Sequence, residues 1–275
     1  MTNINLAIAG ATGWAGSAIV DAALAAPDIT LKSAIARGSA GQDLGTALGR
    51  EPLGLPVHGN VTAALDGVDV LVEFTSHAHA KEIALASIAK GVAVVIGSSG
   101  LTADDYEEVD SQAGAAGVGA IAAGNFSLTA AMMLAGAELA ARLLPQWEII
   151  DYAASTKPDA PSGTARELAE RLQEVREPDV DVPVDQVAGS PDARGATVAG
   201  TQVHSLRIPS FVVSTEIVFG APDERLSIRH DAGGTATPYV TGVLLAVRRV
   251  RDQVGLLRGL DRLLLAEVKG APPRD

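Results

Sequence analysis

The sequence predicts an α/β protein with two domains. The first half of the chain alternates short, almost continuously apolar segments with segments of helical character, which is typical of a parallel sheet covered by helices on both faces. The second half holds three strand-like segments, 202–207, 211–219 and 225–230, with no helical segment between them. Such a run is typical of a mixed or antiparallel sheet. We therefore expect a parallel-sheet domain followed by an α+β domain.

The elements follow in order along the chain. In the first domain we expect strands at 5–9, 31–36, 68–74, 92–96 and 120–123, and helices at 14–26, 78–89 and 102–115. In the second we expect helices at 127–144 and 162–175, a strand at 147–153, and a surface loop at 177–200 before the three strand-like segments named above. Helices at 235–251 and 256–266 close the chain. The predicted boundaries are 1–126, completed by about 236–275, and 127–235.

The composition excludes several functional classes. The chain of 275 residues has no cysteine, which excludes a disulfide scaffold, thiol catalysis and thiolate metal sites. It has no apolar stretch of about 18 residues, so no membrane span is expected, and the start lacks a signal-peptide pattern. A net charge of −12 and 3% aromatic residues argue against nucleic-acid binding. We expect a cytoplasmic protein.

A glycine-rich turn, Gly10-Ala-Thr12-Gly13-Trp14-Ala15-Gly16, joins the first strand to the first helix. The first glycine permits a tight turn, the second lets the backbone approach a pyrophosphate, and the third lets the helix pack closely. The helix N-terminus then offers free N–H groups to the phosphates. The sequence predicts a Rossmann dinucleotide site here; the alternative is an ordinary strand–turn–helix.

The second strand indicates which dinucleotide is bound. A site for the ribose hydroxyl of NAD requires a carboxylate after this strand, and none is present. Arg37 and Ser39 follow the strand instead. An arginine at this place pairs with the 2′-phosphate of NADP. NADPH is therefore expected, with NADH possible. Arg37 as a solvated loop charge is the alternative, and Lys32 and Arg50 are other cations nearby.

Two further loops follow strands of the same sheet, Phe74-Thr75-Ser76 and Gly97-Ser98-Ser99-Gly100. Because ligands bind beyond the carboxyl ends of parallel strands, both loops are expected to face the nicotinamide. His77 and His79 lie beside the first loop, without an acidic or thiol partner nearby in the sequence. We interpret them as part of a polar loop or helix start, and we expect no metal.

The most specific stretch is Lys157-Pro-Asp-Ala-Pro-Ser162-Gly163-Thr164-Ala165. Ser162, Gly163 and Thr164 begin a helix, whose N–H groups and hydroxyls can hold a carboxylate. Lys157 can act as a cationic anchor or a proton donor. The alternative is a capped helix with a surface lysine.

With these motifs the chain resembles the dihydrodipicolinate reductase family, from the glycine turn through 124–127 to the lysine motif. The resemblance implies a Rossmann domain, a mixed-sheet domain that forms a homotetramer or homodimer, and hydride delivery from NAD(P)H to a small carboxylate substrate. It implies that Ser162, Gly163 and Thr164 hold a substrate carboxylate. It places these residues around the nicotinamide: Thr75, Gly97, Ser99, Asn125, Phe126 and Ser127.

The departures from that family are specific. Its His-His pair before the lysine is replaced by Ala153 and Ala154, and two later polar motifs by 213–215 and 234–235. A missing general acid costs ~10²–10⁴ in rate. Asp151 shares a strand face with Ala153 and is a candidate to line the pocket, whereas Arg207 and Glu216 are expected to pair across the sheet.

The leading hypothesis is therefore an NAD(P)H-dependent oxidoreductase acting on a CH–CH or CH–NH type group. It would reduce the C=N or C=C bond of a small, carboxylated, imine-like substrate other than the family's usual one. A genuine 4-hydroxy-tetrahydrodipicolinate reductase is the second hypothesis. A non-catalytic NADP-binding sensor is the third.

Overall fold

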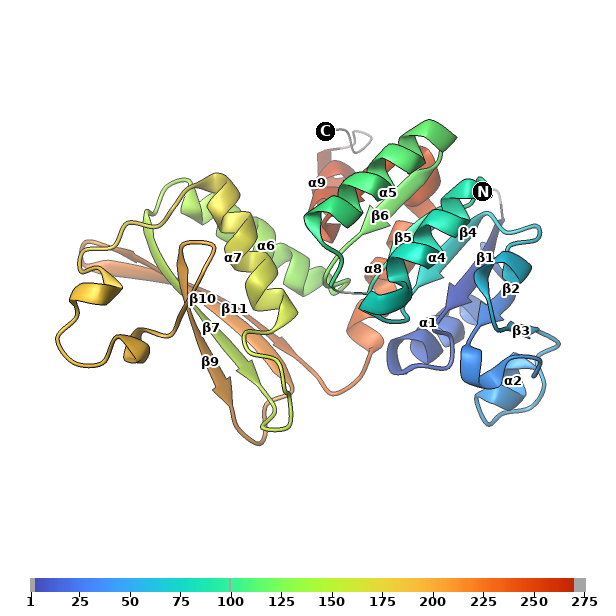
Figure 1. Ribbon diagram of the computed structural model, residues 1–275, viewed down its shortest axis with the longest axis horizontal. Coiled ribbons are helices and arrows are strands. Elements are labelled where there is room, and N and C mark those ends of the chain that lie inside the picture. The colour runs from blue at the N-terminus through green and yellow to red at the C-terminus, as the bar shows by residue number, and fades with distance from the viewer. Residues whose placement is uncertain (1–2, 99, 270–275) are drawn as a thin grey trace. The chain divides into compact units, whose positions relative to one another are not determined.

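The computed structural model describes residues 3–98 and 100–269 (Figure 1). The chain divides into two compact units, one formed by Met1–Leu128 with Ala236–Asp275 and the other by Thr129–Thr235. The first holds a parallel sheet and the second a mixed sheet. The predicted fold class is confirmed.

The sheet of the first unit has the order β12-β6-β5-β4-β1-β2-β3 in the described part of the chain, and every neighbouring pair is parallel. Its strands are β1 (Ile4–Ala9), β2 (Ile29–Ile35), β3 (Val57–His58), β4 (Val70–Glu73), β5 (Ala93–Ile96), β6 (Gly119–Ala122) and β12 (Gly255–Arg258). The carboxyl ends of all these strands therefore lie at one edge, where ligands bind in such sheets.

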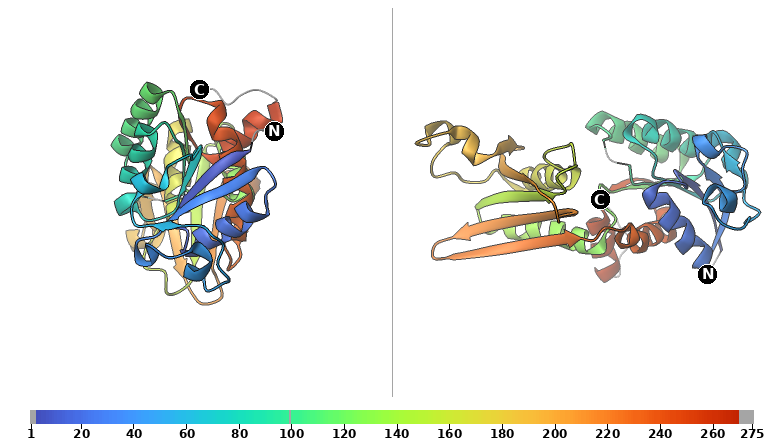
Figure 2. Two further views of the ribbon diagram at one scale, coloured as in Figure 1. Left: turned by 90° about the vertical axis from the view of Figure 1, so that its right-hand side faces the viewer. Right: turned by 90° about the horizontal axis from the view of Figure 1, so that it is seen from below.

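Helices cover both faces of this sheet, as Figure 2 shows. One face carries α4 (His77–Ala89) and α5 (Ala103–Ala116), whose Ile88 and Val109 pack into a core with Leu71 and Val94. The other carries α1 (Trp14–Ala25) and α8 (Thr237–Arg249). Burial on both faces is why the central strands are almost continuously apolar. The remaining helices are α2 (Leu44–Ala47), α3 (Val61–Ala64) and α9 (Leu260–Lys269).

The sheet of the second unit has the order β11-β10-β7-β9-β8 in the described residues. Only β7 and β9 are parallel to each other; the other neighbours are antiparallel. The strands are β7 (Gln146–Ala153), β8 (Ala196–Val198), β9 (Thr201–Arg207), β10 (Val213–Ala221) and β11 (Glu224–Ala232). The helices are α6 (Leu128–Ala141) and α7 (Gly163–Val175).

Strand β7 shows how this sheet is oriented. Its residues alternate strictly between half-buried and buried, and the buried set includes Trp147 and Ile149, which share a core with Met133 of α6 and Leu168 of α7. The alternate residues Glu148, Ile150 and Tyr152 point to the opposite, less covered face. The sheet thus has a helix-covered face and an open face.

The end of the first unit differs from the prediction. The expected helix at 256–266 is wrong in its first turn, because β12 pairs with β6 and α9 starts only afterwards. Gly255 and Gly259 bracket the strand with φ of +86° and +97°, values outside the helical region. Their N–H groups donate to Val118 and Ala122 on the β6 side. The expected loop at 177–200 also contains β8 and two short 3₁₀ turns.

Replacing Gly119 tests the docking of β12 and its preceding turn. A Cβ there would lie 1.8 Å from the carbonyl oxygen of Val250, so Gly119→Ala should lower the free energy of unfolding by about 1–3 kcal/mol, as overpacking does. Gly114→Ala is the matched control, because nothing lies within 4 Å of that Cβ on the exposed face of α5; it should be neutral or stabilising by about 0.5–1 kcal/mol. Urea unfolding measures both, and equal stability of the two variants would contradict the packing described.

Candidate active site

The glycine turn has the geometry that its sequence predicts. Gly10 adopts φ +81°, and a Cβ on it would lie 2.1 Å from the carbonyl oxygen of Phe74. A Cβ on Gly16 would lie 2.0 Å from the carbonyl oxygen of Gly10. Both positions therefore exclude any side chain, because each would collide with backbone. The N–H of Gly13 closes the turn by donating to the Gly10 carbonyl at 2.9 Å.

Helix α1 begins just after Gly13, which occupies the N-cap position without a side chain that could accept a hydrogen bond. The N–H groups of Trp14, Ala15 and Gly16 in the first turn have no acceptor within the helix. An anion at this place would receive those donors and the positive end of the helix dipole. The turn thus fits the pyrophosphate of a dinucleotide.

A cavity of about 640 Å³ opens at this turn, a volume in the range of small-molecule sites. Six of the predicted cofactor residues line it: Gly10, Thr12, Gly13, Arg37, Phe74 and Thr75. Asn60, Thr62, His79 and Glu82 line it as well and were not predicted. Asn60 is the N-cap of α3 and Thr62 is its second residue. This helix has four residues, too few for hydrophobic periodicity to predict it. The residues present fit a dinucleotide.

Arg37 follows β2, the place where the sequence predicts a cation for a 2′-phosphate. It is exposed in the short turn Arg37–Ser39 that follows β2. Arg50, the other arginine near this site in the sequence, forms an ion pair with Asp21 instead: its Nη2 donates to Asp21 Oδ2 at 3.0 Å. The N–H of Ser39 donates to the Ala36 carbonyl at 3.2 Å, which closes the turn that carries Arg37.

A buried carboxylate ties together the two loops predicted to face the nicotinamide. Glu73, the last residue of β4, is fully buried. Its Oε1 accepts hydrogen bonds from the N–H of Thr75 at 2.7 Å, from the Thr75 hydroxyl, and from the Ser98 hydroxyl at 3.0 Å. Its Oε2 has no hydrogen-bond partner among the described residues. Glu73 is not among the residues predicted from the sequence. A lone acidic residue at the end of an apolar strand is the sequence feature that could have identified it.

The other predicted nicotinamide residues are placed by packing. The Phe74 ring fills the space beside Gly97, where a Cβ would lie 2.1 Å from Phe74 Cζ. The buried Phe126 ring lies 5.9 Å from that of Phe74, centre to centre. Asn125 Oδ1 accepts from the N–H of Ser127 at 2.9 Å. Ser99 lies outside the described residues. Contact of this group with a nicotinamide stays a prediction.

In the second unit, α7 starts as the sequence predicts. Ser162 is its N-cap, and its hydroxyl accepts from the N–H of Ala165 at 3.3 Å. The N–H groups of Gly163 and Thr164, at the first two helical positions, have no acceptor within the helix. These two groups form an anion cradle, the name used below for Gly163, Thr164 and the Ser162 cap.

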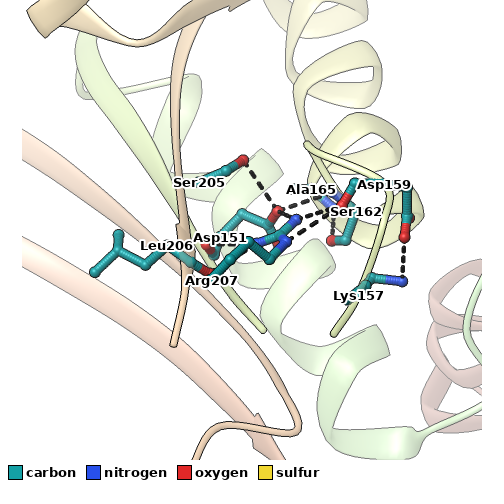
Figure 3. Close-up of polar contacts among 8 residues, drawn as sticks. All are labelled: Asp151, Lys157, Asp159, Ser162, Ala165, Ser205, Leu206 and Arg207. Atoms are coloured by element: carbon teal, nitrogen blue, oxygen red, sulfur yellow. Dashed lines mark hydrogen bonds and ion pairs between the residues drawn. The ribbon is translucent and has the colours of Figure 1, made fainter. Parts of the chain in front are cut away.

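Lys157 precedes the cradle and is partly exposed. Its ammonium binds Asp159 Oδ1 at 2.8 Å, as Figure 3 shows. That hydrogen bond holds the pKa of the Asp159 carboxyl below its usual value. The ion pair therefore holds the Lys157 ammonium beside the start of α7.

Asp151, predicted to line the pocket, is fully buried on β7. Its Oδ2 accepts from the N–H of Ser162 at 2.8 Å, the hydroxyl of Ser205 at 3.2 Å and Nη2 of Arg207 at 2.7 Å (Figure 3). Its described contacts are therefore with the protein itself, and contact with a substrate stays a prediction.

The expected pairing of Arg207 with Glu216 is wrong. Arg207 binds Asp151, while Glu216 accepts a hydrogen bond from the Tyr152 hydroxyl at 2.9 Å on the open face of the sheet. Strand alternation explains the difference, because Glu216 lies opposite Ile150, which points away from Asp151. Tyr152 correspondingly lies on the opposite face from Ala153.

The two alanines at the positions where the resemblance implies histidines differ in exposure. Ala153 ends β7 and is fully buried, and Ala154 is half-buried. The carbonyl of Ala154 accepts from the N–H of Lys157 at 3.0 Å. This segment therefore supports the lysine through its backbone and offers no side-chain proton donor.

Metal binding and membrane insertion find no support in the described residues. No three His, Asp or Glu side chains within them gather to hold a metal ion. His77 is the first residue of α4 and His79 lines the cofactor cavity. None of the helices described above has both the length and the apolar composition of a membrane span.

Comparisons with known proteins give one consistent result. The model of the dihydrodipicolinate reductase N-terminus matches residues 4–126, and that of the C-terminus matches residues 129–264. The 4-hydroxy-tetrahydrodipicolinate reductase of Synechococcus elongatus is 37% identical over 270 residues, covering 95% of this chain and 98% of that protein. The enzyme of the same name from Moorella thermoacetica is 36% identical over 268 residues, covering 96% and 99%.

Solved structures agree with the sequence relatives. The dipicolinate-bound dihydrodipicolinate reductase from Paenisporosarcina sp. TG-14 superposes with a TM-score of 0.79 at 28% identity, covering 94% of this chain and 99% of that one. An amine dehydrogenase from Mycobacterium smegmatis has a TM-score of 0.65 at 16% identity, with 93% and 95% covered. At that identity the second likeness concerns the fold alone.

Neutralising Glu73 tests its function in the cofactor site. Glu73→Gln keeps the size of the side chain but removes the charge that strengthens its hydrogen bonds to the two loops, an effect of about 1.5–3 kcal/mol. We expect the Kd for NADPH to rise at least about tenfold, as ~1.4 kcal/mol implies, when measured by titration calorimetry. Glu82→Gln is the matched control, because Glu82 is an exposed residue lining the same cavity. An unchanged Kd in Glu73→Gln would contradict the proposed link between the buried carboxylate and the cofactor.

Proposed function

The chain belongs to the dihydrodipicolinate reductase family of NAD(P)H-dependent oxidoreductases, and we propose that its substrate is 4-hydroxy-tetrahydrodipicolinate. The observation that carries the proposal is an identity of 37% to an enzyme of that name over nearly the whole of both chains. The relatives thus favour the second hypothesis from the sequence over a different substrate. Lys157 and the anion cradle, the groups suited to a carboxylate, are both present.

The two units divide the chemistry between them. When bound, the dinucleotide would supply a hydride to a carbon of the substrate. The glycine turn and α1 would hold its pyrophosphate, and Arg37 would pair with the 2′-phosphate of NADPH. In the second unit, the N–H groups of Gly163 and Thr164 hold one substrate carboxylate, and the Lys157 ammonium neutralises it. Because Ala153 and Ala154 cannot donate a proton, Lys157 or a water beside it protonates the substrate nitrogen.

A second candidate substrate class follows from the same two alanines. Their methyl groups remove the hydrogen-bond donors that the family resemblance implies for a dicarboxylate. A cyclic imine with one carboxylate needs fewer donors, and the cradle together with Lys157 would suffice for it. The sensor hypothesis is less well supported, because a protein without chemistry has no need for a lysine held beside an anion site.

The proposed oligomer uses the open face of the mixed sheet. Apolar side chains on this face include Ile150, Leu206 and Val218, which line a cavity of about 620 Å³. Burial of such a face against a second copy would remove apolar surface from water. We propose a homotetramer or homodimer formed through it. A cytoplasmic location stays a prediction.

Growth of a diaminopimelate auxotroph tests the substrate. The wild-type gene should restore growth, and Lys157→Ala should not, because loss of an anchor and proton donor is expected to lower kcat/KM by ~10²–10⁴. Lys81→Ala is the matched control; Lys81 pairs with Asp105 and Glu108 on the surface of the first unit. Failure of the wild type at high expression would sink the proposal. Turnover of a monocarboxylate cyclic imine by the purified protein would then support the second candidate.

The preference for NADPH is tested at Arg37. Arg37→Ala should raise the Kd for NADPH by ~10–100-fold, the effect of losing one or two charge-assisted hydrogen bonds to a phosphate, and leave the Kd for NADH unchanged. Arg50→Ala provides the control, since that side chain is bound to Asp21. Fluorescence titration with both dinucleotides measures the difference. An equal loss for NADH would show that Arg37 does not contact the 2′-phosphate.

A further inference from the structure

A buried ion pair lies directly beneath the anion cradle. The Asp151 carboxylate is fully buried, and the Arg207 side chain is only 16% exposed. The Oδ2 atom of Asp151 binds both the Arg207 guanidinium and the N–H of Ser162, the residue that caps α7. The carboxylate therefore fixes the backbone of the helix start, at a point one residue before the two N–H groups of the cradle.

Arg207 extends this connection to the lysine. Its Nη2 and Nε donate to the backbone carbonyl of Asp159 at 2.8 and 3.2 Å. The side chain of Asp159 in turn holds the Lys157 ammonium. Figure 3 shows Arg207 between β7 and the segment that carries Lys157, Asp159 and Ser162. The Arg207 guanidinium, on β9, therefore binds Asp151 of β7, which holds the start of α7, and the Asp159 carbonyl, in the segment that carries the lysine.

The pair is poorly arranged for stability alone. Asp151 Oδ1 has no hydrogen-bond partner within the described residues although it is buried, and burial of an incompletely bonded carboxylate is unfavourable. All the bonds that the carboxylate makes converge on Oδ2, which faces Ser162, Ser205 and Arg207. This one-sided bonding favours a role in holding the segment 157–164 in one position.

We propose that Asp151 and Arg207 are positioning residues, which set the cradle N–H groups and the Lys157 ammonium in place for a substrate carboxylate. The proposal rests on the proposed function only in that the cradle binds a carboxylate. Neither residue needs to touch the substrate. They act through Ser162 and Asp159.

The decisive variant is Arg207→Lys. Lysine keeps the positive charge beside Asp151, but its single ammonium lacks the planar fork that reaches both Asp151 and the Asp159 carbonyl. We expect the Kd for dipicolinate and the KM for 4-hydroxy-tetrahydrodipicolinate to rise at least tenfold. We expect kcat to fall as well, because Lys157 is the proposed source of the proton, and the Kd for NADPH to stay within twofold. Asp151→Asn should shift the same quantities in the same direction.

Arg171→Lys is the matched control. Arg171 is a buried arginine of the second unit that, like Arg207, binds a carboxylate; its Nε donates to Glu138 Oε1 at 2.6 Å, on α6 rather than at the cradle. This substitution is expected to change the melting temperature without moving the dipicolinate Kd. A similar rise of that Kd in both variants would overturn the proposal, because it would reflect a general loss of packing.

Hydrogen exchange of the backbone amides tests the positioning without any ligand. Followed by mass spectrometry, Arg207→Lys should accelerate exchange in peptides covering 155–166 at least tenfold, and leave peptides of the first unit and of β10 unchanged. Unchanged exchange in 155–166, or faster exchange throughout the second unit, would overturn the proposal. If the wild type neither binds dipicolinate nor reduces the substrate, the proposed function fails, and the exchange result still decides on the positioning pair.

Discussion

A buried carboxylate that gathers several donors on one oxygen is the interaction on which both candidate sites depend. In the first unit Glu73 Oε1 joins the loops after β4 and β5 through Thr75 and Ser98. In the second, Asp151 Oδ2 joins the end of β7 to the start of α7 and to β9. A charged acceptor makes bonds about twice as strong as a neutral one. Two segments far apart in sequence are thereby fixed against each other at the place where a ligand would lie.

This arrangement has a cost in stability that must be offset by the surrounding core. Each carboxylate leaves its other oxygen without a partner among the described residues, and such groups are unfavourable away from water. Each unit has an apolar core, which includes Leu71 and Val94 in the first and Ile149 and Ile217 in the second. The apolar cores supply the stability, and the few buried charges determine the geometry of the loops.

Sequence patterns predicted what is local and failed where the partners are distant. The glycine turn was predictable because steric demands at Gly10 and Gly16 arise within the turn and its neighbouring strand. The start of α7 was predictable because capping is a matter of four consecutive residues. By contrast, the partner of Asp151 lies 56 residues away at Arg207, and only the strand register brings them together. Strand β12 was missed for the same reason, since its pairing with β6 spans more than a hundred residues.

Ala153 and Ala154 stand where the family resemblance implies two histidines, and the groups suited to a carboxylate are nevertheless present in the second unit. The network from Asp151 through Arg207 and Asp159 to Lys157 is complete in the structure, although Ala153 and Ala154 carry no donor. The parts that position a carboxylate are therefore retained without the side chains that would deliver a proton beside them. Lys157 is the cation that this network holds in place, and under the proposed function it or solvent would supply the proton. The proposed binding of a carboxylate and the proposed supply of a proton therefore depend on different groups: the cradle with its ion pair for the first, and Lys157 or solvent for the second.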